Sequence, residues 1–147
     1  MRFILVDEIL ELEPGKRIRA VKTFDPGEEL FRDHFPGFPV VPGVLLTEMM
    51  AQAAGKCLNA ESPSRGLAIL ARLKSATFRD WVLPGQKAGI FCEIRTSRAQ
   101  FATANGHVEI EGRRVCTAEL FFTFVPASRF AENYRDEVLD RYLLSHR

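Results

Sequence analysis

The sequence predicts an α+β fold in which antiparallel strands accompany one long, buried helix. Three observations support this prediction: a length that suits one domain, a nearly apolar segment rich in helix formers, and several segments in which apolar and polar residues alternate. The chain has 147 residues, of which 46% are hydrophobic and 27% are charged. These values are close to those of globular domains, so they exclude a disordered chain and leave little room for a second domain.

The charge and the cysteine content limit the kinds of partner and the cellular compartment that we expect for this protein. Lysine and arginine number 20 against 19 acidic residues, so the net charge of +1 gives no overall attraction to nucleic acid or to an anionic membrane. The three cysteines, Cys57, Cys92 and Cys116, form no C-x-x-C pair, which argues against a disulfide framework and a thiolate metal site. Residues 1–7 hold only four consecutive apolar residues, too few for a signal peptide or a membrane span. We therefore expect a cytoplasmic protein.

Period-two patterns predict the strands. Segments 16–24 and 88–95 each place apolar residues at alternate positions, as a strand with one buried face does. A similar pattern runs from Val108 to Phe124 and is interrupted by turn residues 111–113, which predicts an antiparallel hairpin. The half of the chain after residue 66 is therefore expected to be mainly strand.

The segment from Pro42 to Leu58 is predicted to be a buried helix, because it is rich in helix formers and apolar almost all round. Pro42 suits the first turn of a helix, and Gly55 is expected to weaken its C-terminal end. The few polar residues are spaced by four and so share one stripe of the helix: Glu48, Gln52 and Lys56.

A second helix, amphipathic and mostly surface-lying, is predicted within residues 127–147. Apolar residues recur there three and four positions apart from Tyr134 to Leu143. We treat this segment as a C-terminal helical extension of one domain that spans residues 1–147.

A stiff loop with three prolines and two glycines, residues 33–43, precedes the buried helix. It brings the imidazole of His34 near the helix N-terminus, where unpaired N–H groups and the helix dipole stabilise negative charge. Glu48 follows about one and a half turns into the helix. A general base, a general acid and an anion-stabilising amide could therefore converge here.

The residue types alone leave other interpretations open. A single histidine in such a loop is more often a hydrogen-bonded structural residue than a catalyst, and the polar stripe is equally compatible with the solvated edge of an amphipathic helix. Because the rest of the helix is so apolar, a narrow cleft beside the stripe is the alternative. His107 and His146 are expected to be ordinary surface residues, and Cys57 and Cys116 to belong to the core.

Residue types and spacing together define a longer pattern: His34–Gly37, Pro39–Leu45, Glu48 and Met50–Gly55. This pattern closely resembles the FabZ-type 3-hydroxyacyl-acyl carrier protein dehydratases. Residues 5–17 are similar to the opening strand and turn of that family, and residues 74–85 to its later strand-and-turn block. The resemblance covers roughly residues 3–125.

The resemblance implies a hotdog fold, in which an antiparallel sheet wraps a long central helix. It also implies a homodimer with its active sites at the subunit interface, each combining His34 of one chain with Glu48 of the other. Family members often assemble further into hexamers, as trimers of dimers, and the sequence leaves that choice open.

The implied reaction is the reversible elimination of water from a 3-hydroxyacyl thioester to give a trans-2-enoyl thioester, in fatty-acid or related acyl-chain biosynthesis. The substrate would be carried on acyl carrier protein, and no metal or organic cofactor is called for. By this resemblance, His34 would remove the proton next to the thioester carbonyl and Glu48 would protonate the departing hydroxyl. The N–H of Gly43 would bind the carbonyl oxygen.

Several features depart from the family pattern. Asp33 stands where a small residue is usual, Phe38 stands where the family is often polar or basic, and the tail from about residue 127 extends past the usual end. We expect the tail to cover a tunnel mouth or a subunit contact. Five basic residues form either a patch for an acidic carrier protein or scattered surface charge: Arg72, Lys74, Arg79, Arg113 and Arg114.

Two other functions remain as alternatives. One is a non-catalytic acyl-binding or partner subunit of a lipid or polyketide pathway, which Asp33 and the added tail suggest. The other is a hotdog thioesterase, which is less well supported because Glu48 is matched by a suitably spaced histidine. Acyl chain length and substrate type are left open by the sequence.

Overall fold

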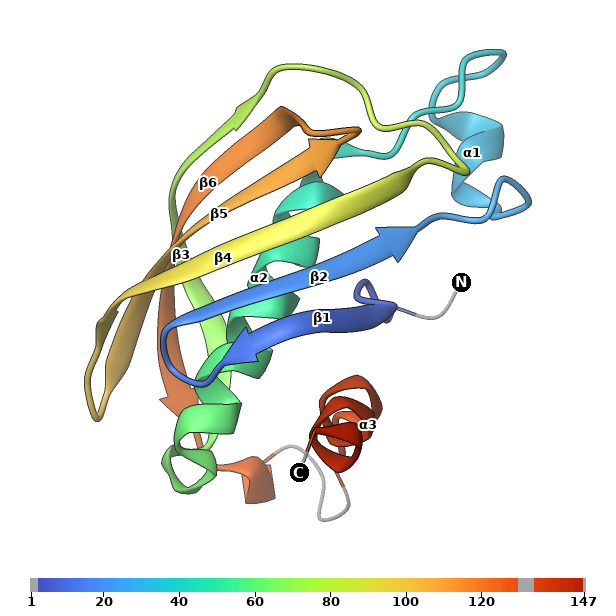
Figure 1. Ribbon diagram of the computed structural model, residues 1–147. Coiled ribbons are helices and arrows are strands. Elements are labelled where there is room, and N and C mark those ends of the chain that lie inside the picture. The colour runs from blue at the N-terminus through green and yellow to red at the C-terminus, as the bar shows by residue number, and fades with distance from the viewer. Residues whose placement is uncertain (1–2, 130–133, 147) are drawn as a thin grey trace.

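Six strands form a single antiparallel sheet in the computed structural model, which describes residues 3–129 and 134–146 (Figure 1). In chain order they are β1 (Glu8–Glu13), β2 (Arg17–Thr23), β3 (Leu67–Phe78), β4 (Lys87–Ser97), β5 (Phe101–Ile110) and β6 (Arg113–Val125). Their order across the sheet is β1-β2-β4-β5-β6-β3, so β3 crosses over to pair with the last strand. β1 and β3 are therefore the two edges of the sheet.

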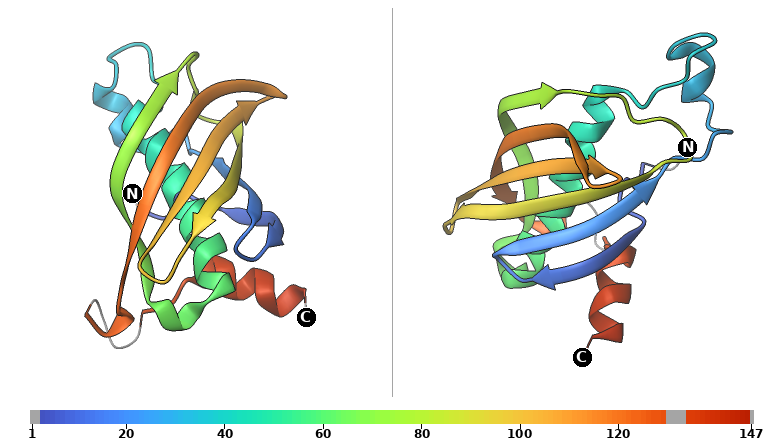
Figure 2. Two further views of the ribbon diagram at one scale, coloured as in Figure 1. Left: turned by 90° about the vertical axis from the view of Figure 1, so that its left-hand side faces the viewer. Right: turned by 45° about the horizontal axis from the view of Figure 1, so that its top comes forward.

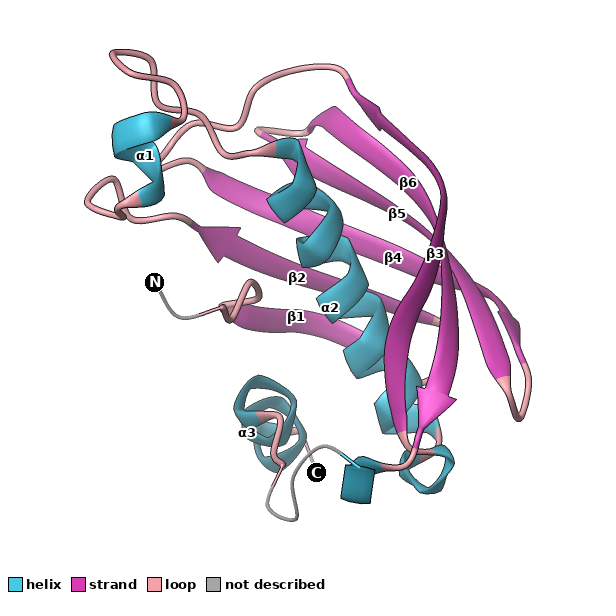
Figure 3. Ribbon diagram, turned by 180° about the vertical axis from the view of Figure 1, so that it is seen from behind, coloured by secondary structure: helices cyan, strands magenta, loops and turns pink. Residues whose placement is uncertain are grey.

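Three α-helices accompany the sheet in the described part of the chain. α2 (Gly43–Glu61) lies across the inner face of the sheet, which is seen from behind in Figure 3. α1 (Leu30–Asp33) precedes α2, and α3 (Glu137–Ser145) packs beside β1. One antiparallel sheet wrapped around one long helix is the hotdog arrangement, so the predicted α+β fold class is confirmed.

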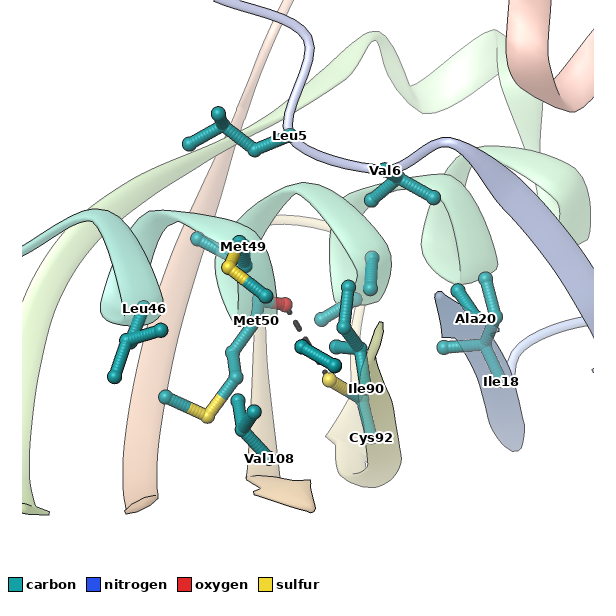
Figure 4. Close-up of a cluster of buried hydrophobic side chains, with 14 of the residues drawn as sticks. Leu5, Val6, Ile18, Ala20, Leu46, Met49, Met50, Ile90, Cys92 and Val108 are labelled. Carbon is teal, nitrogen blue, oxygen red and sulfur yellow. Dashed lines mark hydrogen bonds between the residues drawn. The ribbon is translucent and has the colours of Figure 1, made fainter. Parts of the chain in front are cut away.

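The core lies between α2 and the inner face of the sheet. In Figure 4, Leu46, Met49 and Met50 of α2 point toward Ile90 and Val108 of β4 and β5, and all five side chains are buried. Burying a side chain of this size contributes roughly 1.5–3 kcal/mol. The apolar residues of α2 therefore hold the helix, and with it Glu48, in a fixed position on the sheet.

The predicted hairpin has a tight turn at the place the sequence indicates. β5 ends at Ile110 and β6 begins at Arg113, and the two residues between them, Glu111 and Gly112, have φ angles of 51° and 79°. Two positive φ angles in a two-residue loop match the right-handed twist of the flanking strands. The strands predicted at 16–24 and 88–95 correspond to β2 and β4.

α2 continues six residues beyond Gly55, where the sequence predicts that the helix weakens. Gly55, Cys57 and Leu58 are all buried in this last part of the helix. Tertiary packing of a buried face therefore outweighs the low helix propensity of one glycine, which amounts to about 1 kcal/mol.

The two edges of the sheet differ in what lies beside them. α3 packs against β1, whereas β3 runs along the opposite side with no helix of the described residues beyond it (Figure 2). The middle of β3, residues 71–75, is exposed. β3 is thus a long edge strand, and its exposed middle part is available to pair with another chain.

Candidate active site

His34 lies at the end of α1, in a loop that the core holds in place. The N–H of His34 donates to the carbonyl of Leu30 at 3.2 Å, which closes the short helix. Phe31, one turn earlier, is buried and packs edge-on against Phe24, with the ring centroids 6.4 Å apart. Further along, the N–H of Val41 donates to the carbonyl of Val82 at 2.8 Å. Both sides of the histidine are therefore anchored.

The hydrogen bond of the imidazole defines which ring nitrogen can act as a base. Nδ1 of His34 lies 3.2 Å from the carbonyl oxygen of Val40. A carbonyl oxygen only accepts hydrogen bonds, so Nδ1 must carry the proton and donate it. In the neutral ring, Nε2 then has the free lone pair that a general base needs. The ring is half-buried and stacks on Phe35 at a centroid distance of 4.5 Å.

Gly43 is the first residue of α2, and its N–H has no partner within the helix. A Cβ atom at this position would lie 3.0 Å from the ring of Phe78, at the end of β3. Glycine therefore lets Phe78 pack directly over the helix N-terminus. The free N–H and the positive end of the helix dipole can stabilise an oxyanion there.

Glu48 is partly buried and is positioned by the next polar residue on the same face of α2. Nε2 of Gln52 donates to Oε1 of Glu48 at 3.3 Å and to the carbonyl of Phe3 at 3.2 Å. Oε1 of Gln52 accepts from the N–H of Leu5 at 2.9 Å. Gln52 thus ties the N-terminal segment of the chain to the candidate acid.

Glu48 also lines a groove of about 300 Å³ between α2 and β3. The polar stripe therefore borders a cleft, one of the two alternatives that the sequence left open. Its last member, Lys56, is not solvated either: the residue is 7% exposed, and Nζ lies 2.9 Å from Oδ2 of Asp136. The solvated-edge interpretation of the stripe is wrong for Lys56.

Within one chain, the described residues show no hydrogen bond or ion pair between His34 and Glu48. The imidazole contacts Val40 and Phe35, whereas the carboxylate contacts Gln52 and faces the α2–β3 groove. The two predicted groups therefore belong to two separate local arrangements in the single chain.

Two features of the site were not predicted from the sequence, the acceptor of the His34 hydrogen bond and the partner of Lys56. The carbonyl of Val40 orients His34, but a backbone acceptor leaves no trace in residue types. Asp136 pairs with Lys56 across 80 positions of sequence. Asp136 did carry one signal, because Asp is a typical N-cap residue at a helix start, and its side chain accepts from the N–H of Leu139 at 3.0 Å.

The structure describes the surroundings of three of the basic residues singled out in the sequence. Arg113 pairs with Asp80 at 2.5 Å, and Arg114 lines a cavity of about 630 Å³ that also borders β2, on the outer face of the sheet. Arg79 is exposed and follows Phe78 directly. Arg79 is thus the basic residue nearest in sequence to the ring that covers the α2 N-terminus.

The remaining histidines and the cysteines lie away from these groups. His107 is half-buried and stacks on Phe91 with a centroid distance of 4.7 Å, and His146 is exposed on the last turn of the chain. The three cysteines are buried, as predicted for Cys57 and Cys116. Asp33 is exposed. Among the described residues, no helix has the length and apolar character needed to cross a bilayer.

Comparison with solved structures supports the fold. The dehydratase heterocomplex ApeI:P from Xenorhabdus doucetiae matches with a TM-score of 0.59 and 16% identity, covering 78% of this chain and 96% of that one. A hypothetical thioesterase with coenzyme A from Streptococcus pneumoniae TIGR4 matches with a TM-score of 0.65 and 12% identity, covering 81% and 85%. At such low identities the likeness concerns the fold alone.

Sequence comparison is more specific. The profile of the FabA-like domain matches residues 1–119. A 3-hydroxyacyl-[acyl-carrier-protein] dehydratase FabZ from Ruminiclostridium cellulolyticum is 35% identical over 126 residues, which cover 85% of this chain and 89% of that protein. The FabZ of Bacillus licheniformis is 38% identical over 122 residues, covering 82% and 85%. With His34, Gly43 and Glu48 all inside the matched region, the chain belongs to the FabZ-type dehydratases of the FabA-like family.

Proposed function

We propose that this protein is a 3-hydroxyacyl-[acyl-carrier-protein] dehydratase, a hydro-lyase that reversibly removes water from a 3-hydroxyacyl thioester in fatty-acid or related biosynthesis. The relatives named above carry this activity in their names and match most of the chain. The observation that carries the assignment is the hydrogen bond between His34 and the Val40 carbonyl, because it leaves Nε2 as a positioned base next to the helix N-terminus.

In the proposed reaction, Nε2 of His34 takes the proton from the carbon next to the thioester carbonyl. The electrons form the new carbon–carbon double bond as the bond to the 3-hydroxyl breaks. Glu48, in its acid form, gives a proton to that hydroxyl, which leaves as water because hydroxide alone is a poor leaving group. Each of these proton transfers is worth about 10²- to 10⁴-fold in rate in other enzymes.

The N–H of Gly43 supports the same step by binding the carbonyl oxygen while enolate character develops. A single backbone donor in such a position is worth about 3 kcal/mol in other enzymes. The N–H is already fixed by the helix, so no reorganisation is needed during the reaction. Transfer of the proton from His34 back to Glu48 through solvent returns the site to its starting state.

The complete site is proposed to form in a homodimer, with His34 of one chain facing Glu48 of the other. The Glu48 groove is bordered by Ala68–Leu70 of β3, the open edge of the sheet. Exposed apolar side chains, among them Leu73 and Phe78, lie on the same strand. A second copy that pairs along β3 would cover these side chains and bring its own loops to the groove. A hexamer would be three such dimers.

Acyl carrier protein is the proposed partner, and the cytoplasm the proposed compartment. A carrier that delivers a thioester must dock near the α2 N-terminus, where Gly43 lies. Arg79 is exposed beside Phe78, which packs on Gly43, so a positive charge is available at this entrance for an acidic partner.

The proposal is tested with purified protein and 3-hydroxyacyl thioesters of acyl carrier protein, by following formation of the enoyl thioester. We expect turnover by the native chain and a loss of at least about 100-fold in kcat for His34→Ala. His107→Ala is the matched control, because His107 is bound to Glu109 on another part of the sheet. Circular dichroism checks that both variants fold.

Unchanged turnover in His34→Ala contradicts the mechanism. Release of free thiol in place of enoyl product would instead identify a thioesterase. Tight binding of acyl carrier protein without turnover at any chain length would identify a non-catalytic partner subunit.

A further inference from the structure

Gln52 lies between the candidate acid and the N-terminal segment of the chain, residues 3–7. It follows Glu48 by one helical turn on the same face of α2, and both residues are partly buried. Oε1 of the Gln52 amide accepts from the N–H of Leu5 at 2.9 Å. Nε2 donates to the carbonyl of Phe3 at 3.2 Å and to Oε1 of Glu48 at 3.3 Å. The oxygen and both N–H groups of the amide are therefore engaged.

The backbone of the N-terminal segment determines which way the Gln52 amide points. The N–H of Leu5 can only donate and the carbonyl of Phe3 can only accept, so the amide oxygen must face Leu5 and the NH2 group must face Phe3. A flipped amide would bring two donors together at Leu5 and two acceptors together at Phe3. The NH2 group is therefore the part of the amide that faces Glu48.

The N-terminal segment is itself fixed at several points. The side chain of Leu5 is fully buried and lies beside α2 (Figure 4). Nζ of Lys22, on β2, donates to the carbonyl of Ile4 at 3.1 Å. The carbonyl of Asp7 accepts from Arg141 of α3 at 3.2 Å. The segment is thus tied to the core, to β2 and to α3, and it holds the Gln52 amide in one orientation.

The contact with Gln52 makes the two oxygens of Glu48 unequal. Oε1 accepts the hydrogen bond from the amide. In a neutral carboxyl group the carbonyl oxygen is the better acceptor, so Oε1 takes that part and Oε2 carries the proton. The amide therefore sets both the position of the side chain and the oxygen from which a proton can leave.

We propose that Gln52 is a positioning residue for the acid: the N-terminal segment fixes its amide, and the amide holds Glu48 with the transferable proton on Oε2. The inference rests on the proposed dehydratase function and adds to it the way in which the acid is oriented. All contacts of this arrangement lie within one chain, so it is complete whichever chain supplies His34. A displacement of about 1 Å near the reacting groups can lower the rate about 100-fold, so loss of the amide should reduce kcat.

Two substitutions at Gln52 separate a positioning role from a structural one. Gln52→Met has a similar length but no amide, so it removes the contacts with Leu5 and Glu48 together. Gln52→Glu keeps an oxygen that can accept from the N–H of Leu5, but it removes the NH2 group, and its charge repels Glu48. With 3-hydroxyacyl thioesters of acyl carrier protein, we expect both variants to lose about tenfold or more in kcat with little change in KM. Native kcat in Gln52→Glu would overturn the inference.

Hydrogen exchange of the Leu5 amide, followed by NMR, measures the contact with the N-terminal segment directly. This amide should be protected in the native chain and in Gln52→Glu, and it should exchange faster in Gln52→Met. A low kcat in Gln52→Glu with a protected Leu5 amide assigns the loss to Glu48 and not to loosening of the segment. Equally fast exchange in the native chain and in Gln52→Met would show that Leu5 does not hold the amide.

A backbone substitution tests the same contact from the other side. Leu5→Pro removes the N–H that orients the amide, and Leu5→Val is the matched control, because it also shortens the side chain but keeps the N–H. Leu5→Pro should have a lower kcat than Leu5→Val in the native background. In the Gln52→Met background the two should have equal kcat, because the amide is already absent. An equal effect of Leu5→Pro in both backgrounds would show a general structural disturbance and would contradict the inference.

The proposed function can fail separately from this inference. Turnover that is lost in His34→Ala but native in Gln52→Met and Leu5→Pro would keep the dehydratase assignment and remove the role of Gln52 alone. Absence of turnover by the native chain at every acyl length would remove the assignment itself, and the role of Gln52 with it.

Discussion

Burial determines the chemistry of the three cysteines. Cys57, Cys92 and Cys116 have no exposed surface or almost none, and burial is the main cause of the raised pKa of each thiol. For Cys116 burial is the sole cause and raises the pKa from 9.0 to about 11. Cys57 also reaches about 11, although hydrogen bonds from the backbone of Gly15 and Lys16 oppose the shift. The thiolate needed for nucleophilic chemistry is therefore negligible near neutral pH.

The raised pKa of Cys116 predicts a loss of stability at high pH. Between about pH 9 and 11 the unfolded chain loses the thiol proton and the folded chain retains it, so the free energy of unfolding falls as pH rises. The expected full contribution of this one thiol is about 3 kcal/mol, present below pH 9 and lost above about pH 11.

Urea unfolding of the native chain and of Cys116→Ala, at pH 8 and near pH 11, measures this contribution. Lysines and tyrosines titrate in both proteins, so their effects cancel in the difference. The stability advantage of the native chain over Cys116→Ala should narrow by about 2 kcal/mol at the higher pH. An advantage of constant size would show that Cys116 is not protected from ionisation.

At the residue scale, the sequence predicts the candidate site through side chains and misses what the backbone adds. His34, Gly43 and Glu48 are recognisable because their types and spacing form one pattern. The acceptor that orients His34 is the carbonyl of Val40, and every residue carries such a carbonyl. Only the folded loop shows which carbonyl faces the imidazole.

Asp136 connects two helices, because it caps α3 and pairs with Lys56 of α2. The two roles use different atoms: Oδ1 accepts from Leu139, and Oδ2 lies 2.9 Å from Nζ of Lys56. The cap alone is worth about 1 kcal/mol. Removing one partner of a nearly buried ion pair costs more, about 3 kcal/mol, because the other charge is left unpaired.

Asp136→Asn separates these roles, because asparagine is as good an N-cap as aspartate but carries no charge. We expect a loss of about 3 kcal/mol in the free energy of unfolding, measured with urea. The double variant Lys56→Met, Asp136→Asn should regain most of it, since no charge is then left buried. Arg135→Ala, which removes an exposed pair with Asp140 at 4.0 Å, is the control and should cost under about 1 kcal/mol. A similar small loss for Asp136→Asn would assign the whole role of Asp136 to the cap.

At the element scale, the strands with regular alternation were predicted and the irregular ones were not. β3 pairs with β6 through register shifts between Leu70 and Arg72 and again between Leu73 and Ser75. Each shift adds a residue that breaks the period of two, so the apolar side chains of β3 no longer alternate along the sequence. β1 has a similar shift between Ile9 and Glu11. The family resemblance indicated strand segments in both regions, where the alternation of residues alone did not.

The predicted second helix is shorter than the segment proposed for it. α3 covers Glu137–Ser145, while residues 130–133 and 147 of the predicted extension lie outside the described part of the chain. Val138 and Leu139 are its buried residues, in agreement with the amphipathic spacing. Its place beside β1, and the ion pair between Lys56 and Asp136 at its start, depend on contacts between distant segments that no local pattern encodes.

For the whole molecule, the important asymmetry is between the two edges of the sheet. α3 packs against β1, whereas the middle of β3 is exposed beside the Glu48 groove. The same chain keeps His34 and Glu48 in separate arrangements. Both facts are explained together if the unit that performs the reaction is a two-fold dimer joined along β3, with each site shared between the chains.

A shared site predicts that two inactive variants restore each other. His34→Ala and Glu48→Gln chains, each inactive alone, are mixed under conditions that let dimers exchange, and dehydration is measured. In a mixed dimer one site receives both substitutions and the other receives native His34 and native Glu48. Random exchange makes about half of the dimers mixed, so we expect about a quarter of the native activity. If both groups of a site came from one chain, every chain in the mixture would lack one of them and the activity would stay at the level of the separate variants.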